Sequence, residues 1–155
     1  MSHIVIQRPY KKGFIPKAAQ LRQFGMHVLD QFKPEHEVTI RIVSQDEMRA
    51  LNNTYRHKDK PTNVLSFKMD VPDNMILKPM PLGDVIICAD VVNQEASAEK
   101  LPPLAHWAHM VIHGILHLLG HDHEHDDDTE IMQAIEIKMM QDFGFDNPYK
   151  QGKKE

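Results

Sequence analysis

One segment of the chain leaves few choices of fold. Residues 105–119 carry apolar side chains over nearly the whole circumference of a predicted helix. The polar exceptions are histidines, which fall within about 80° of one another at ~100° per residue: His106, His109, His113 and His117. A helix that is apolar nearly all round is buried, and a buried imidazole without a partner costs ~1–3 kcal/mol. The segment therefore predicts a central buried helix whose histidine stripe binds a partner.

The spacing of the histidines favours a metal ion as that partner. His113 and His117 lie four residues apart, so their rings project from neighbouring turns and can bind one ion. Gly120 allows the chain to reverse after the helix, and His123 can then return to the same ion. The other histidines of residues 121–125 are alternatives for this third position. Three imidazoles leave one position open for water, which is typical of a catalytic zinc site, although other divalent transition metals also accept such ligands.

Two further residues are candidates for assisting this site. His109 lies one turn before His113, and Asp122 lies between two histidines. Either side chain could orient a metal ligand through a hydrogen bond or transfer a proton. For His109, the alternative is packing in the interior. For Asp122, a role at the site and no role there are equally consistent with the sequence.

The composition excludes several classes of protein. The single cysteine, Cys88, excludes an intrachain disulfide and a cysteine-based metal cluster. The longest apolar run, residues 85–89, is far shorter than the ~20 residues of a membrane helix, and the N-terminal residues show no secretion signal. A net charge of −4 argues against binding nucleic acid over the whole surface but allows a local basic patch. We expect a cytoplasmic protein with no membrane contact.

Hydrophobic periodicity predicts strands and helices within one domain. Strands are expected at residues 4–6, 38–43, 63–67 and 84–89. Helices are expected at residues 16–32, 44–54, 90–100, 103–119 and 128–143. Loops are expected at residues 55–62 and 71–82, and a frayed tail at residues 150–155. Because no linker or repeat divides the chain, residues 1–155 are predicted to form a single domain.

The predicted loop at residues 55–62 carries a basic cluster. Arg56, Lys58 and Lys60 stand against one acid, Asp59, so three positive charges and one negative charge leave a local charge of +2. A guanidinium in such a loop can bind phosphate with its planar fork, and the lysines can add weak, salt-sensitive binding to a nucleic-acid backbone. An ordinary solvated loop is the alternative interpretation.

The histidine spacing also resembles a peptidase signature. Metzincins carry His-Glu-x-x-His-x-x-Gly-x-x-His, in which the glutamate acts as general base. Here Gly114 occupies the position of that glutamate, and glycine cannot transfer a proton. A zinc peptidase of the metzincin type therefore remains only as an alternative.

Three motifs in the same order resemble the YbeY family, the bacterial endoribonucleases of rRNA maturation. The motifs span residues 113–123 with the histidines, residues 55–67 (Tyr-Arg-His-Lys-Asp-Lys-Pro-Thr-Asn-Val-Leu-Ser-Phe), and residues 82–87 (Leu-Gly-Asp-Val-Ile-Ile). The resemblance covers roughly residues 38–149. It implies a single α+β, zincin-like domain, in which a mixed four-stranded sheet is surrounded by helices and the metal helix lies at the centre.

The resemblance also implies a function. It implies a zinc-dependent endoribonuclease that is specific for single-stranded RNA and acts in 16S rRNA 3′-end maturation and ribosome quality control. Its partners would be rRNA, the small ribosomal subunit and the assembly factors of that subunit. His113, His117 and His123 would be the zinc ligands, and Arg56 the catalytic arginine. A ribosome assembly factor without enzymatic activity, whose zinc is structural, is the remaining alternative.

Overall fold

The computed structural model describes residues 3–121 and 126–149, which form one four-stranded sheet and five helices. The strands are β1 (His3–Gln7), β2 (His36–Val43), β3 (Val64–Lys68) and β4 (Met80–Cys88). The helices are α1 (Ala18–Phe32), α2 (Gln45–Arg56), α3 (Ala89–Ala98), α4 (Pro103–Leu118) and α5 (Asp126–Asp142). The strand order is β1-β2-β4-β3, with β3 antiparallel to β4 and the other pairs parallel. The predicted α+β class with a mixed four-stranded sheet is confirmed.

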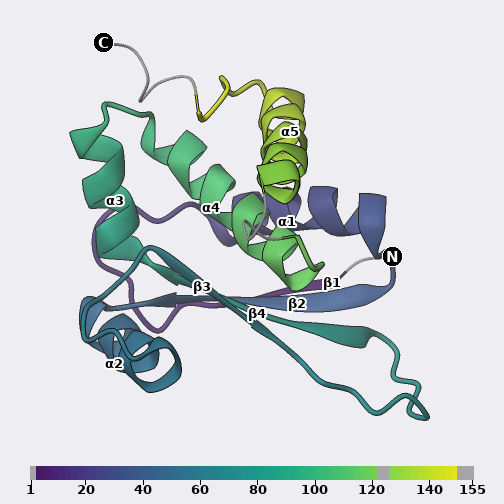
Figure 1. Ribbon diagram of the computed structural model, residues 1–155. Coiled ribbons are helices and arrows are strands. Elements are labelled where there is room, and N and C mark those ends of the chain that lie inside the picture. The colour runs from purple at the N-terminus through teal and green to yellow at the C-terminus, as the bar shows by residue number, and fades with distance from the viewer. Residues whose placement is uncertain (1–2, 122–125, 150–155) are drawn as a thin grey trace.

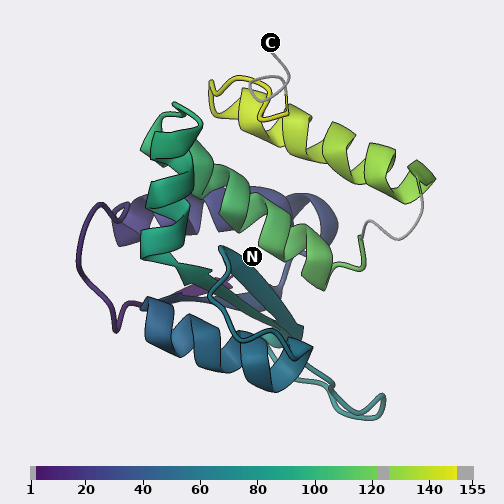
Figure 2. The same ribbon diagram turned by 60° about the vertical axis from the view of Figure 1, so that its left-hand side comes forward.

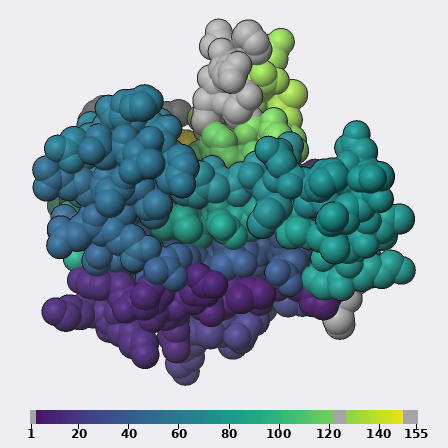
Figure 3. All heavy atoms as spheres, turned by 90° about the horizontal axis from the view of Figure 1, so that it is seen from below, coloured from purple at the N-terminus to yellow at the C-terminus, as the bar shows by residue number. Residues whose placement is uncertain are grey.

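The helices cover the two faces of the sheet unequally. In Figure 1, α1, α3, α4 and α5 lie on one side of the sheet and α2 lies on the other. Figure 2 shows α4 between the sheet and α5, so α4 is the central helix that the sequence predicts. The connection between β3 and β4, residues 69–79, extends beyond the part of the sheet that the helices cover (Figures 1 and 3).

Strand β4 is buried on both faces because helices lie on both sides of it. Val85 and Ile87 pack into the larger core with α1 and α4, whereas Ile86 and Cys88 pack into a smaller core with α2. A strand buried on both faces needs a continuous apolar run. This requirement explains the unbroken apolar sequence at residues 85–89.

Helix α4 meets the sheet at Gly114, where the two backbones approach closely. A Cβ atom at this position would lie 2.6 Å from Cγ1 of Val85. The hydroxyl of Ser66, on β3, donates a hydrogen bond of 2.8 Å to the carbonyl oxygen of Gly114. Gly114 therefore faces the sheet, and this contact holds α4 against the edge strand.

Although α4 is buried and apolar, every helix in the described part of the chain is too short or too polar to cross a membrane.

Several element boundaries differ from the sequence predictions. Helix α2 continues to Arg56 instead of ending near Thr54, because His57 adopts a left-handed conformation (φ 59°) and caps the helix there. Arg56 is therefore a helical residue, and the expectation that it lies in a loop was wrong. Strand β4 begins at Met80, inside the expected proline-rich loop, because residues 80 and 81 pair with the start of β2. Helix α5 begins at Asp126, two residues before the predicted start.

Replacing Gly114 by alanine is expected to destabilise the protein. The added Cβ would press on Val85, a buried and β-branched side chain that has little freedom to turn away. Overpacking of this kind costs about 1–3 kcal/mol, which exceeds the ~1 kcal/mol that alanine adds to helix propensity. We expect a lower free energy of unfolding in urea denaturation.

Gly25→Ala in α1 is the matched control for this experiment. Its Cβ would lie 2.8 Å from Cδ1 of Ile4, which is the far end of a flexible side chain on the edge strand β1. The gain in helix propensity is the same, but the clash is easier to relieve. Equal stability of the two variants would contradict a tight contact between α4 and β4.

Candidate metal centre

His113 and His117 point their rings towards each other from successive turns of α4. Their Nε2 atoms lie 3.1 Å apart. Two imidazole nitrogens that bind one tetrahedral zinc ion at ~2.0–2.1 Å are roughly 3.3 Å apart. The two rings therefore fit a shared divalent cation, as their spacing in the sequence predicts.

A buried carboxylate on α5 holds the other side of this cluster. Oε2 of Glu136 lies 2.7 Å from Nδ1 of His113 and 3.0 Å from Nε2 of His109. The hydroxyl of Tyr149 donates a hydrogen bond to Oε1 of the same carboxylate. Glu136 has no solvent exposure, so all its hydrogen bonds are made inside the protein. We call these four residues, His109, His113, Glu136 and Tyr149, the carboxylate cluster.

The hydrogen bonds to Glu136 favour its ionised form. Burial by itself would raise the pKa of the Glu136 carboxyl group, but hydrogen bonds from His109 and His113 outweigh burial and lower this pKa to about 2. Burial and the hydrogen bond to Glu136 raise the pKa of the Tyr149 hydroxyl, so that hydroxyl remains a donor. The cluster thus contains a buried negative charge, which a cation bound to the imidazoles would balance.

Two sets of ligands for a metal ion can be drawn from the described residues. Donor atoms of His109, His113 and Glu136 lie within 4.8 Å of one another and could hold an ion. The second set is His113 and His117 through their facing Nε2 atoms. Both sets contain His113, which has one nitrogen towards Glu136 and the other towards His117. The donors in either set suit a transition metal.

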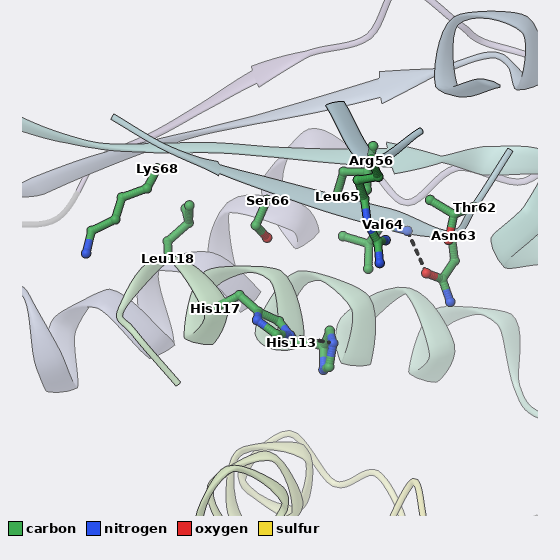
Figure 4. A pocket seen from close by; sticks show the side chains of 10 residues that line it. All are labelled: Arg56, Thr62, Asn63, Val64, Leu65, Ser66, Lys68, His113, His117 and Leu118. Carbon is green, nitrogen blue, oxygen red and sulfur yellow. Dashed lines mark hydrogen bonds between the residues drawn. The ribbon is translucent and has the colours of Figure 1, made fainter. Parts of the chain in front are cut away.

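A cavity of about 480 Å³ opens between α4 and the edge strand β3, and the two facing histidines form part of its wall. Figure 4 shows Arg56 extending from the end of α2 towards α4, with Lys68 at the other end of the cavity. The residues that line the cavity are Arg56, Thr62, Asn63, Val64, Leu65, Ser66, Lys68, His113, His117 and Leu118. An anion in this cavity would meet positive charge on either side of the two imidazoles.

The structure brings together only some of the residues predicted from the sequence. His113, His117 and Arg56 share one cavity, and His109 contacts Glu136 on the side towards α5. The predicted third ligand, His123, and the predicted assisting residue Asp122 lie outside the described residues. His121, one of the alternative third ligands, places its ring 6.0 Å from the ring of Phe32.

Lys58 and Lys60 are exposed and are absent from the residues that line the cavity. Asp59, which stands between them, forms an ion pair with Arg49, with 2.7 Å between Oδ1 and Nε. This contact lowers the pKa of the Asp59 carboxyl group. The acid of the basic cluster is thus paired with a cation on α2, and the two lysines face solvent outside the cavity.

Three residues of the site were not found from the sequence: Glu136, Tyr149 and Lys68. The signal for Glu136 was available, because it lies four residues from Met132 and from Met140, both of which are buried. Ile131, the first apolar residue of the segment predicted as this helix (128–143), is instead 53% exposed. Nothing in the local pattern distinguishes Tyr149 or Lys68 from surface residues.

The fold and the site define a class of protein. It is an α+β protein whose central helix presents a facing pair of histidines, able to bind a metal ion, to a cavity that Arg56 and Lys68 also line. The family model "Endoribonuclease YbeY" matches residues 10–144. The chain therefore belongs to the YbeY endoribonuclease family, and this membership implies a metal-dependent endoribonuclease of rRNA processing.

A solved structure shows the same fold. The chain is similar to the solution structure of TM1509 from Thermotoga maritima, with a TM-score of 0.60 and 25% sequence identity. The match covers 91% of this chain and 87% of that chain. The residues that the family model matches include α4 with His113 and His117.

Binding of a divalent transition metal is expected to stabilise the protein through the facing histidines. At a free zinc concentration 100-fold above Kd, the free energy of unfolding should rise by ~2.7 kcal/mol. His113→Ala and His117→Ala should each lose most of this increase, which thermal unfolding with and without zinc can measure. His36→Ala is the control, because His36 lies at the start of β2, away from α4. An equal zinc effect in all four proteins would contradict a metal site on α4.

Proposed function

We propose that this protein is a zinc-dependent endoribonuclease that cleaves single-stranded RNA in 16S rRNA 3′-end maturation and in ribosome quality control. His113, His117 and His123 would hold the zinc ion. The protein would act in the cytoplasm as one catalytic domain, on rRNA and with the small ribosomal subunit and its assembly factors. The observation that carries this proposal is the cavity shared by His113, His117 and Arg56 in a member of an endoribonuclease family.

Arg56 is proposed to be the catalytic arginine. Cleavage of a phosphodiester bond develops negative charge on the phosphoryl oxygens, and a guanidinium can bind two of those oxygens with parallel hydrogen bonds. Arg56 is the last residue of α2, so a rigid helix carries its side chain to the wall of the cavity. A bound zinc ion would add Lewis acidity at the same phosphoryl group.

Because position 114 is a glycine, another residue must act as the general base. This position faces Val85 in the sheet, so a glutamate would not fit here, and the peptidase alternative loses its general base for a steric reason. His109 and Asp122 are the proposed proton-transferring residues from the sequence; His109 is hydrogen-bonded to Glu136. The products would identify the nucleophile, because attack by the RNA 2′-hydroxyl leaves a cyclic phosphate and direct attack by water does not.

Arg56→Ala is expected to lower the rate of RNA cleavage about 10²–10³-fold, since removing one stabilising donor of a developing oxyanion costs that much in other enzymes. Zinc affinity should stay close to that of the wild type, because Arg56 is not one of the residues proposed to hold the zinc ion. Cleavage of labelled single-stranded RNA by the zinc-loaded protein measures the first quantity, and chelator competition measures the second. Lys12→Ala, an exposed lysine outside the cavity, is the control.

The same assay separates the alternatives. Unchanged RNA cleavage in Arg56→Ala together with a zinc requirement for folding would favour the assembly factor with a structural zinc. Peptide cleavage by a pure protein that leaves RNA intact would favour the peptidase.

Lys68→Ala is expected to weaken the binding of single-stranded RNA. Lys68 lines the cavity, whereas Lys58 and Lys60 lie outside it, so loss of Lys68 should have the larger effect. Each lost phosphate contact should reduce the slope of log K against log salt by ~0.7 for a single strand. Fluorescence anisotropy at several salt concentrations measures this slope. A larger effect of Lys58→Ala and Lys60→Ala would place the RNA path over the loop after α2 instead.

A further inference from the structure

We propose that Glu136 is a positioning residue that holds His113 in the orientation and tautomer needed to bind the metal ion. The inference rests on the proposed metal site at His113 and His117 and adds to it a residue from α5. Glu136 lies 23 residues after His113 in the sequence, and its Oε2 lies 2.7 Å from Nδ1 of His113. No sequence motif described above includes it.

The hydrogen bond from His113 selects one of the two neutral forms of its ring. When Nδ1–H donates to the carboxylate, the lone pair of the neutral ring is on Nε2. Nε2 is the atom that lies 3.1 Å from Nε2 of His117. The carboxylate thus places the metal-binding nitrogen of His113 opposite that of His117.

Glu136 is itself held from two sides. Nε2 of His109 lies 3.0 Å from the same oxygen that His113 contacts, and the hydroxyl of Tyr149 donates to the other oxygen. The ring of Tyr149 also packs edge-to-face on His109, with 5.3 Å between the ring centroids. The segment after α5 therefore closes the carboxylate cluster on the side away from the cavity, and it gives Tyr149 a role at the site.

A direct role of Glu136 as a metal ligand fits the structure less well. The two carboxylate oxygens together already accept three hydrogen bonds, from His109, His113 and Tyr149. An ion bound to Oε2 would have to displace the donors of His109 and His113. An ion bound to the facing Nε2 atoms leaves the cluster intact, so Glu136 acts through His113.

Glu136→Gln in the full chain tests the proposal, because glutamine keeps the size of the side chain and removes its charge. We expect the affinity for Zn²⁺ and Co²⁺ to fall about 10–100-fold, the loss typical of removing such an outer partner. Tyr149→Phe removes one hydrogen bond to the carboxylate and should cause a smaller loss in the same direction. Competition with a chromophoric chelator measures both affinities, and thermal unfolding of the metal-free variants reports whether they fold.

Glu95→Gln is the matched control. Glu95 accepts a hydrogen bond of 2.8 Å from Nε2 of His106, which lies on the same histidine stripe of α4, seven residues before His113. This variant loses a carboxylate–histidine pair of the same kind at the far end of the stripe. Its affinity for zinc should equal that of the wild type.

Spectroscopy distinguishes a positioning role from ligation. With Co²⁺ at saturation, the visible d–d spectrum of Glu136→Gln should match that of the wild type, because the ligands are unchanged. Nitrogen NMR of the His113 ring in the metal-free protein should show Nδ1–H in the wild type and a mixture of tautomers in the variant. A changed d–d spectrum would make Glu136 a ligand and overturn the proposal.

The outcomes separate this inference from the proposed function. Zinc affinities of Glu136→Gln and Tyr149→Phe within twofold of the wild type would overturn the positioning role while the metal site stands. A wild-type protein that binds neither ion would overturn the metal site itself. If the wild type binds zinc and Glu136→Gln and Glu95→Gln lose zinc affinity to the same extent, the loss would reflect a general loss of structure. This result would also overturn the inference.

Discussion

The contact between α4 and the sheet at Gly114 determines where the functional residues lie. Because the glycine has no side chain, the helix approaches Val85 on β4 and accepts a hydrogen bond from Ser66 on β3. Gly114 thus faces the sheet, while the neighbouring His113 and His117 line the cavity beside β3. A bulkier residue here would push the helix away from the edge strand and widen the distance between the histidines and Arg56.

Buried charge is the second constraint on this molecule. Glu136 carries an ionised carboxylate into the space between α4 and α5, where it has no solvent exposure. In the described part of the chain, the groups that bind it are the imidazoles of His109 and His113 and the phenol of Tyr149. A buried negative charge is tolerated when it is hydrogen-bonded and balanced, and a divalent cation on the far side of His113 would contribute to that balance. The same arrangement that makes the interior stable therefore favours metal binding.

A protein with a net charge of −4 can still bind a polyanion if its positive groups are gathered at one place. Arg56 and Lys68 come from the end of α2 and the end of β3, and both reach the cavity that contains the histidines. Outside the cavity, some acids are paired with cations, as Asp59 is with Arg49. Binding concentrated at one cavity suits an endoribonuclease that holds its RNA at the point of cleavage and releases the rest.

Local sequence patterns determined the central features of this protein: a buried helix, a histidine pair able to share a cation, and the alternation of strands and helices around them. These features follow from periodicities of 2 and 3.6 residues, which neighbouring residues establish by themselves. The extra turn of α2 that carries Arg56 depends on the left-handed cap at His57, which the sequence pattern does not reveal. Only the tertiary structure decided that Glu136 and Tyr149 from the C-terminal region meet His113, and that Lys68 joins Arg56 at one cavity. Such contacts join residues far apart in the chain, and they depend on how helices pack across a sheet, which no local period encodes.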